Sequence, residues 1–391
     1  MRTYGTQVIG IRTPIIREGD DLAQTVVGSL SEYCEETSSK LNDGDVIGVT
    51  EAVVARAQGN YATVEQIAAG VRSIFPSGTV GVVFPILSRN RFSIALKGIA
   101  AGADSLVIQL SYPADEVGNR LVEPERLYET GINPYTDVLT AEEFCRHFGK
   151  PEHRFTGVDY LELYKELGNG AKIILANDPG EILKHTNQVI AADIHTRAQT
   201  KRRLKSLGAQ TVVGLDDILS ESVNGSGFNS QYGLLGHNKA SEDRVKLFPH
   251  SCEEFVVKTQ ELIRERFGAK VEVLIYGDGA FKDPVGGIWE LADPVVSPAF
   301  TEGLDGLPCE LKLKYIADVE FGDKSGEEAR VAVVERIRKK MTQMGKDENQ
   351  GTTPRRLPDL IGSLCDLTSG SGDKGTPVVL VKGYFDNYSD E

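Results

Sequence analysis

Hydrophobic residues recur along the chain with two different spacings. Short apolar runs rich in β-branched residues predict strands, whereas apolar positions that repeat every three to four residues predict helices. The expected strands are residues 7–12, 45–50, 79–85, 105–110, 172–177, 211–215, 271–279 and 377–384. The expected helices begin near Asp20 and after Ser251, and also span residues 51–59, 328–341 and 357–367. This pattern predicts a mixed α/β (α+β) fold.

The middle of the chain differs in pattern from its two ends. Between residues 90 and 235, strand-like apolar runs alternate with helical patterns, as they do in βα units. The Gly/Ser-rich stretch GSGFNSQYG (225–233) has too little apolar content to pack, so we expect it to close this block. The sequence therefore predicts a core formed by 1–89 and 236–391, with an inserted α/β lobe over 90–235.

Composition and charge narrow the class of protein. The 391 residues include 43 Lys and Arg and 57 Asp and Glu, which gives a formal net charge of −14. This surface argues against broad contact with nucleic acid or an anionic membrane, but it allows a phosphate to be bound locally. The five cysteines are scattered without a CxxC pair, so we expect reduced thiols. No apolar run approaches the ~18 residues of a membrane span, and no signal peptide is evident, so a cytoplasmic location is expected.

The first candidate for chemistry is LIYGDGAFKDP (274–284), where a buried strand ends in Gly-Asp-Gly. The glycines let a ligand approach the backbone closely. Asp278 is a candidate ligand for Mg²⁺ or Mn²⁺ beside nucleotide phosphates, and Lys282 is a candidate to neutralise the phosphate. The alternative is a simple β-turn in which Asp278 was selected for turn geometry.

A second candidate is the loop TSGSGDKGTP (368–377), which lies between a helix and a strand. Its glycines and hydroxyls, with Ser371 and Lys374, are suited to a phosphate-binding nest, although the Walker pattern is absent. A flexible surface loop is the alternative.

A third candidate is the segment GHNKASEDR (236–244). Its ligand-type and phosphate-type side chains are His237, Asn238, Lys239, Ser241 and Asp243. A solvated loop explains the same residues. The basic stretch over 191–208, with Arg197, Lys201, Arg202 and Lys205, is more typical of a solvated helix face than of a phosphate contact.

Taken together, segments at both ends of the chain resemble the coenzyme F420-0:L-glutamate ligase (gamma-glutamyl ligase) family. The resembling segments are IGIRTPIIREGDDL (9–22), DGDVIGVTEAVVARAQG (43–59), YGLLGHNKASEDRVKLFP (232–249), VEVLIYGDGAFKDPVGG (271–287) and GTPVVLVKGY (375–384). They occur in the family's order, and the block over 90–235 has no counterpart that we match.

The resemblance implies a two-domain ligase fold that is not a doubly wound Rossmann sheet, in a homodimer. It implies that GTP activates the carboxylate of a small-molecule acceptor as an acyl phosphate, which the amine of L-glutamate attacks to form an amide. It also implies two divalent metal ions, Mg²⁺ or Mn²⁺.

The resemblance also assigns roles to particular residues. One metal aspartate corresponds to Asp278, and the other corresponds to Asn238, a neutral residue that Asp243 or Glu242 would have to replace as a carboxylate. The family's phosphate-contacting lysine corresponds to Arg56, and its neighbouring serine to Glu51. We further expect Lys239 and Lys282 to be catalytic, and Ser241, Ser371 and Lys374 to bind the nucleotide.

Two alternatives remain open from the sequence. One is a regulatory protein that binds nucleotide but has lost catalysis, which Asn238 favours. The other is the same ligase chemistry on an acceptor that is not a deazaflavin, selected by the block over 90–235. The sequence does not decide between GTP and ATP.

Overall fold

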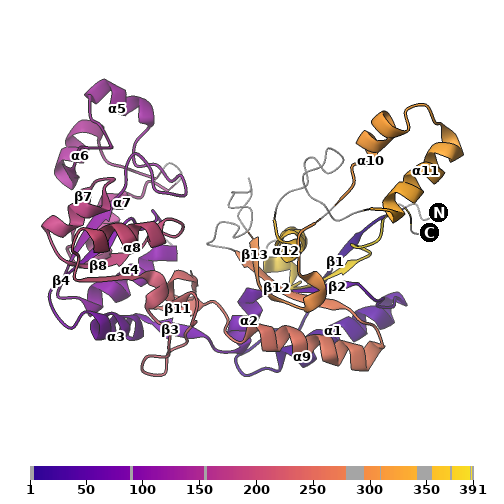
Figure 1. The fold of residues 1–391 in the computed structure, drawn as a ribbon. Helices are drawn as coiled ribbons and strands as arrows, with labels where there is room; N and C mark the ends of the chain where they lie inside the picture. The colour runs from indigo at the N-terminus through magenta and orange to yellow at the C-terminus, as the bar shows by residue number, and fades with distance from the viewer. Residues whose placement is uncertain are drawn as a thin grey trace. The chain divides into compact units, whose positions relative to one another are not determined.

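The computed structural model describes residues 4–88, 91–153, 156–278, 295–308, 310–340, 355–369, 372–387 and 389. The chain divides into two compact units (Figure 1). The first unit contains residues 1–57 and 251–391, and the second contains residues 58–250. These limits differ from the expected boundaries at 90 and 235, because the strand over 79–83 pairs inside the sheet of the second unit.

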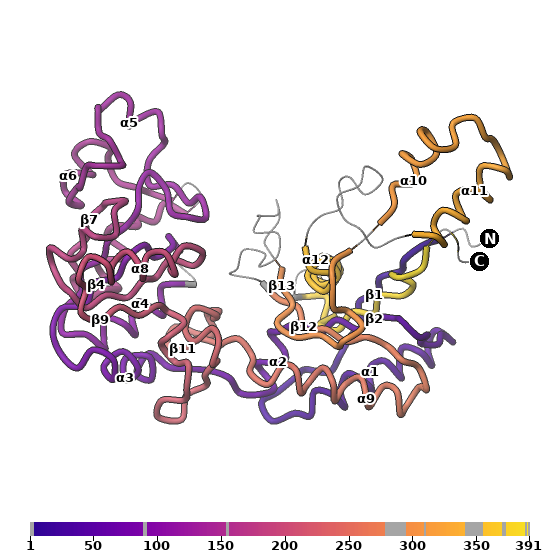
Figure 2. The backbone as a smooth tube through the Cα atoms, viewed as in Figure 1, coloured from indigo at the N-terminus to yellow at the C-terminus, as the bar shows by residue number. Residues whose placement is uncertain are grey.

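The first unit contains a five-stranded sheet. In spatial order its strands are β1 (Gln7–Ile11), β14 (Val378–Lys382), β2 (Val46–Thr50), β12 (Glu272–Asp278) and β13 (Val295–Phe300). Only β2 and β12 run parallel, and every other neighbouring pair is antiparallel. Figure 2 shows the first and last strands of the chain side by side, β1 in indigo and β14 in yellow.

Helices cover both faces of this sheet, which gives the first unit three layers (Figure 1). On one face, α1 (Leu22–Thr37) and α9 (Cys252–Phe267) bury Leu30 and Ile263 against β2 and β12. On the other face, α12 (Leu357–Ser369) buries Cys365. Position 48 of β2 has to be glycine, because a Cβ atom there would lie 2.6 Å from the Cys365 sulfur.

The described part of the first unit also contains α2 (Glu51–Ala57), α10 (Leu313–Tyr315), the π-helical turn Ile316–Glu320 and α11 (Gly326–Arg338), with short 3₁₀ helices at Glu302–Leu304 and Gly372–Lys374. Asp21 is the N-cap of α1, and its carboxylate accepts from the Gln24 N–H. Ser38 is the C-cap and has the left-handed conformation, with φ 54°. Lys258 of α9 pairs with Asp21 at 2.9 Å, so the cap also ties the two helices together.

The second unit contains a six-stranded sheet. In spatial order its strands are β6 (Leu139–Thr140), β7 (Lys172–Leu175), β5 (Ser105–Leu110), β4 (Thr79–Val83), β8 (Gln188–Ala191) and β9 (Thr211–Gly214). All of these strands are parallel except β6 at the edge. The helices of this unit are α3 (Val64–Ile74), α4 (Arg91–Gly102), α5 (Pro124–Thr130), α6 (Ala141–Phe148), α7 (Tyr160–Leu167) and α8 (Arg197–Ser206), with a 3₁₀ helix η1 (Pro179–Lys184).

The order of the parallel strands is that of a doubly wound sheet. Numbered by their sequence from β4, the five parallel strands lie in the order 3-2-1-4-5, and the order reverses between β4 and β8. The expectation that the fold is not a doubly wound Rossmann sheet is therefore wrong for the second unit. The crossover from β7 through η1 to β8 passes the middle of the sheet, where Ile182 of η1 packs against Val83 and Val107.

The Gly/Ser-rich stretch packs inside the second unit, contrary to expectation. Asn60 donates to the Phe228 carbonyl at 3.0 Å and accepts from the Phe228 N–H at 2.8 Å. Asn229 is buried, and its amide donates to the Pro249 carbonyl at 2.9 Å. Polar side chains therefore hold this stretch in place, although it has few apolar residues.

A small antiparallel sheet completes the second unit, with β11 (Arg244–Leu247) between β10 (His237–Lys239) and β3 (Tyr61–Thr63). The unit begins and ends at neighbouring points, because the Gln58 side chain bonds both the carbonyl and the N–H of His250. Across the described residues, no helix combines the length and the apolar character needed to cross a membrane.

Candidate functional site

A cavity of about 410 Å³ lies in the first unit at the carboxyl end of β2. Its lining residues come from the segment after β1, the end of β2, α2, the end of α12 and the loop before β14: Thr13, Pro14, Ile15, Ile16, Thr50, Ala52, Val53, Arg56, Asp366, Ser369, Gly375, Thr376 and Pro377. Two of the motifs identified in the sequence, the segment around Arg56 and the loop over 368–377, therefore meet at one cavity.

Backbone hydrogen bonds join the segments around this cavity. The Thr13 N–H donates to the Gly375 carbonyl at 3.3 Å, and the Thr50 N–H donates to the Pro377 carbonyl at 3.0 Å. The Thr376 hydroxyl donates to the Ser369 carbonyl at 3.2 Å, which closes the loop on itself. The cavity wall is thus held by the ends of β2 and β14.

Glu51 lies directly against the strand that carries Asp278. It follows β2 without a linker and is buried, with 6% of its surface exposed. A Cβ atom at Gly277 would lie 2.0 Å from the Glu51 Cγ, so glycine is required for the carboxylate to sit there. Because Tyr276 pairs with Thr50, Asp278 ends β12 at the same edge of the sheet.

The charge of Glu51 also affects Cys252, the first residue of α9. The pKa of Cys252 is raised to about 12, mainly by burial and then by the nearby Glu51 and Glu253 carboxylates. Burial and these carboxylates therefore favour the protonated thiol of Cys252.

Several predicted residues of the first unit are less fully described. Lys282 and Ser371 lie outside the described residues, and for Asp278 only the backbone is described. Lys374 is exposed in the turn Gly372–Lys374, just before β14. Arg56 is exposed at the last turn of α2, on the rim of the cavity.

The predicted residues of the 236–244 segment belong to the second unit, on β10 and the turn that follows it. Lys239 pairs with Glu242 at 2.5 Å, and the Ser241 hydroxyl donates to Asp243 at 2.6 Å. The bond from Lys239 holds the pKa of Glu242 below its usual value. Asn238 is half-buried opposite Lys246 of β11. Within the described ranges, no group of three or more His, Cys, Asp or Glu side chains is arranged to hold a metal ion.

The basic stretch around α8 is occupied by ion pairs. Arg197 pairs with Asp216 at 3.0 Å, and Lys201 pairs with Asp217 at 2.5 Å. These partners lie in the turn after β9, so the pairs connect α8 to that turn.

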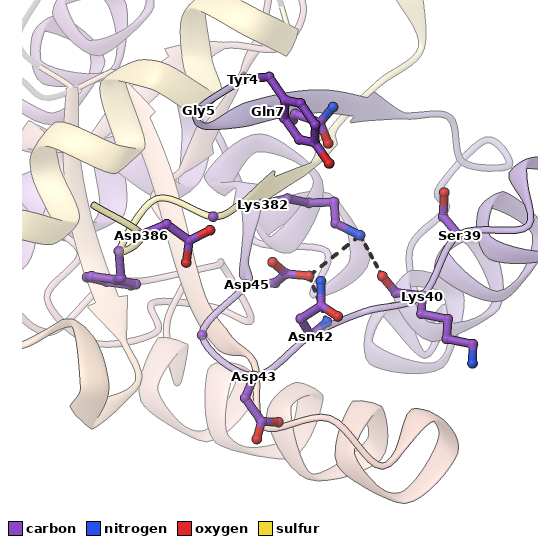
Figure 3. A pocket seen from close by; sticks show the side chains of 13 residues that line it. Tyr4, Gly5, Gln7, Ser39, Lys40, Asn42, Asp43, Asp45, Lys382 and Asp386 are labelled. Carbon is purple, nitrogen blue, oxygen red and sulfur yellow. Dashed lines mark hydrogen bonds and ion pairs between the residues drawn. The ribbon is translucent and has the colours of Figure 1, made fainter. Parts of the chain in front are cut away.

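A different pocket, of about 390 Å³, lies at the opposite end of β2 (Figure 3). Asp45 precedes β2, is almost fully buried, and lies 3.9 Å from the Lys382 ammonium at the end of β14. Lys382 also donates to the Lys40 carbonyl at 2.5 Å. Burial raises the pKa of Asp45, whereas the Asn42 N–H and Lys382 lower it. None of the site residues predicted from the sequence lines this pocket, which we therefore interpret as a structural anchor for two strand ends.

These features define an α/β protein with a cavity at the carboxyl end of β2 in the sheet of its first unit. The chain belongs to the F420-0:gamma-glutamyl ligase family, whose model matches residues 10–383. The matched range includes residues 90–235. A stretch of 64 residues is 36% identical to the coenzyme F420:L-glutamate ligase of Methanothermobacter thermautotrophicus, and it covers 16% of this chain and 24% of that protein. The chain thus matches about a quarter of the length of this relative.

Proposed function

We propose that this protein is a ligase that uses GTP to join L-glutamate to a carboxylate of an F420-type acceptor through an amide bond. The observation that carries the proposal is the family match over residues 10–383, within which Arg56 and the loop before β14 border one cavity. The activity named for the Methanothermobacter relative is consistent with it.

The proposed reaction has two steps. A carboxylate resists attack by an amine because its anion is stabilised by resonance. In the first step, a carboxylate oxygen of the acceptor takes the γ-phosphoryl group of GTP and releases GDP. In the second step, the glutamate amine attacks the acyl carbon, the carbon–oxygen bond to phosphate breaks, and the nitrogen loses a proton, which leaves the amide and inorganic phosphate.

The side chains of the chain would bind and orient these groups. We propose that Arg56, Lys374, Lys239 and Lys282 neutralise the nucleotide phosphates. We propose that the hydroxyls of Ser241 and Ser371 donate hydrogen bonds to the nucleotide. The buried Glu51 carboxylate against Gly277 fits a divalent cation, because hard cations prefer carboxylate oxygen. We propose that Glu51 and Asp278 hold Mg²⁺ or Mn²⁺, with Asn238 and Asp243 as weaker candidates. Such an ion, when bound, offsets the negative charge of the phosphate oxygens.

We also propose that the protein acts as a homodimer in the cytoplasm. A second candidate function, nucleotide binding without catalysis, is favoured by the neutral Asn238 at a position where the family resemblance implies an aspartate.

The test is the dependence of phosphate release on acceptor. Purified protein with GTP, Mn²⁺ and L-glutamate should release phosphate only when an F420-type carboxylate is added, and Arg56→Ala should lower this rate by about tenfold or more. Arg264→Ala, on the exposed face of α9, removes the same charge away from the cavity and should leave the rate unchanged. Release that ignores the acceptor indicates a nucleotidase. Binding of GTP with no release under any condition favours the regulatory alternative.

A further inference from the structure

The second unit contains a cavity that the proposed ligase reaction does not use. It measures about 450 Å³ and is bordered by Phe84 just after β4, Asn177 after β7, and the first turns of α8. It therefore opens at the carboxyl edge of the parallel sheet, where the strand order reverses between β4 and β8. In open α/β sheets, ligands bind outside the carboxyl ends of the strands at such a reversal.

The side of this cavity formed by α8 presents hydrogen-bond acceptors. Asp193 follows β8 and is completely buried, and its Oδ2 accepts from the hydroxyls of Thr196 and Thr200, each at 2.7 Å. Each hydroxyl has one proton, so a threonine that donates to Asp193 offers only lone pairs to a ligand in the cavity that both line. The Thr196 hydroxyl also lies 3.4 Å from Glu116. The second oxygen of Asp193 is buried and has no hydrogen-bond partner in the described part of the chain.

A second buried acceptor lies at the same edge of the sheet, beyond β4. Gln109 pairs with Val83, which pairs with Ala191, so these residues form one row across the strands. The Gln109 amide donates to the carbonyls of Ala176 and Asp178, at 3.1 and 2.8 Å. Its Oε1 is buried without a partner among the described residues. Asp193 and Gln109 are both fully buried and neither lines the cavity, so these two acceptors lie behind its wall. The acceptors that a ligand in the cavity reaches are the hydroxyls of Thr196 and Thr200.

The usual position for a phosphate at this edge is already filled. Glu116, from the loop after β5, accepts from the N–H groups of Ile194 and His195, the latter at 3.1 Å. Free N–H groups before a helix are what a phosphate needs. Burial raises the pKa of Glu116, and these two N–H bonds lower it. The ligand of this cavity is thus recognised through donors rather than through a phosphate at α8.

We propose that this cavity binds a nucleoside, with its ribose hydroxyls donating to the hydroxyl oxygens of Thr196 and Thr200 and its base against Phe84 and Tyr135. A ribose carries two adjacent hydroxyl donors, which match the two threonine oxygens. Tyr135 lines the cavity with 87% of its surface exposed, and Phe84 lines it from the end of β4. Aromatic side chains stack on any base, so the site does not select one by this contact. The proposal is independent of the ligase function.

The experiment is a titration of the full chain with adenosine and guanosine, followed by ligand-observed NMR and calorimetry. Saturable binding is expected, and Tyr135→Ala should weaken it by about tenfold, the effect of losing one stacking partner. Tyr128→Ala is the matched control, because Tyr128 is 86% exposed on α5 of the same unit and does not line the cavity. Both variants remove an exposed ring, so a difference between them cannot come from a general loss of folding.

Further arms separate this site from the ligase site and from a phosphate site. Arg56→Ala should leave nucleoside binding intact even if it abolishes the ligase reaction. Replacing adenosine by 2′-deoxyadenosine should weaken binding, and inorganic phosphate should not compete. The proposal is overturned by any of three results: no saturable binding of either nucleoside, equal affinity of the Tyr135 and Tyr128 variants, or equal affinity for the 2′-deoxy analogue.

Discussion

The two units place polar groups at the carboxyl ends of parallel strands in different ways. In the first unit, only β2 and β12 are parallel, and Glu51, the residue directly after β2, packs against Gly277 of β12. In the second unit, five parallel strands share one edge, and the buried carboxylate of Asp193 stands two residues beyond β8. The site in the first unit depends on the close approach of Glu51 to Gly277. The cavity in the second unit depends on the order of the strands in the sheet.

This difference explains how each site depends on its sequence. A carboxylate packed on a glycine leaves no room for change at either position, so single substitutions in the first unit should act strongly. A cavity at a strand-order reversal exists because of the whole sheet, so single substitutions there should change ligand binding and leave the sheet intact. The predictions below test this contrast, beginning with the largest expected effect.

Removing the carboxylate at the end of β12 should have the largest effect. We expect Asp278→Asn to lower the ligase rate by about 100-fold or more, because charge stabilisation of a transferring phosphoryl group is lost. Nucleotide should no longer raise the melting temperature in the presence of Mn²⁺, while the melting temperature of the free protein stays unchanged. The measurements are acceptor-dependent phosphate release and thermal unfolding.

The control for this variant is Asp43→Asn, in the exposed turn before β2. Asp43 accepts from the Lys270 N–H at 2.7 Å, which an asparagine oxygen also does. If Asp278→Asn and Asp43→Asn have equal activity, Asp278 is not a metal ligand.

A single added methyl group at Gly277 should have the next largest effect. The Cβ atom of Gly277→Ala would lie 2.0 Å from the Glu51 Cγ, so Glu51 has to move. We expect a loss of about 1–3 kcal/mol of stability, as in other overpacked cores, and a lower ligase rate. Gly28→Ala in α1 is the matched control, since its added Cβ meets nothing within 4 Å. It should be neutral or stabilising by up to about 1 kcal/mol. Full activity of Gly277→Ala would show that the ligase reaction does not depend on the position of Glu51.

Much of the secondary structure could be predicted from the sequence. The strand over 105–110 and the helix that begins at Glu51 agree with the expectation, because each has a clear local period. The strands β8 and β13 were missed, as were the short strands β3, β6, β10 and β11. β8 has only four residues, and β13 contains Pro298, which is tolerated because β13 is an edge strand. The doubly wound order could not be predicted, since strand order depends on pairing between distant segments.

The candidate sites likewise combine residues that could be predicted from local sequence with contacts that depend on the fold. Arg56 and the loop over 368–377 were identified by residue type and by resemblance, and they border one cavity. The part played by Lys239 was not predicted from the sequence, because its ion pair with Glu242 depends on the turn after β10. Asp193 was also missed. The signal that could have identified Asp193 is an acidic residue directly after the apolar run over 189–192, next to the basic stretch that begins at Arg197.

Removing the polar bonds that hold the Gly/Ser-rich stretch should destabilise the second unit alone. Asn229→Ala removes a buried amide that bonds the Phe248 and Pro249 carbonyls, so we expect a loss of about 1–3 kcal/mol. Limited proteolysis should then cut within 225–231, where the native chain should resist. Gln231→Ala, an exposed side chain two residues later, is the control. Rapid cleavage of the native chain within 225–231 would contradict the packing described here.

The smallest expected effect is a pH dependence of opposite sign in the two units. Hydrogen bonding to Lys258 lowers the pKa of Asp21 in the first unit, and burial raises the pKa of Asp193 in the second. Hydrogen bonds from Thr196 and Thr200 and the charge of Arg197 oppose this rise in the pKa of Asp193. The carboxylates of Asp193 and Glu116 are close enough that the charge of Asp193 raises the pKa of Glu116. A carboxyl group whose pKa is lowered by folding stabilises the fold at any pH above its pKa in the unfolded chain. This stabilisation is lost as the pH falls through the pKa in the folded protein. A carboxyl group with a raised pKa has the opposite effect, and stability falls as the pH rises from the unfolded value through the folded pKa.

Replacing each aspartate by asparagine should therefore change the stability of its own unit in opposite directions. Asp21→Asn should destabilise the first unit at neutral pH by no more than about 0.5 kcal/mol, because Asp21 and Lys258 are half exposed and solvent screens their attraction. The difference should vanish in acid. Asp193→Asn keeps an oxygen to accept from both threonines, so it should remove the loss of stability that the second unit undergoes as the pH rises from 3.8. Urea titrations read by pulse proteolysis and mass spectrometry report the peptides of each unit separately. If both variants shift their units in the same direction with pH, the contrast between a solvated cap and a buried acceptor is wrong.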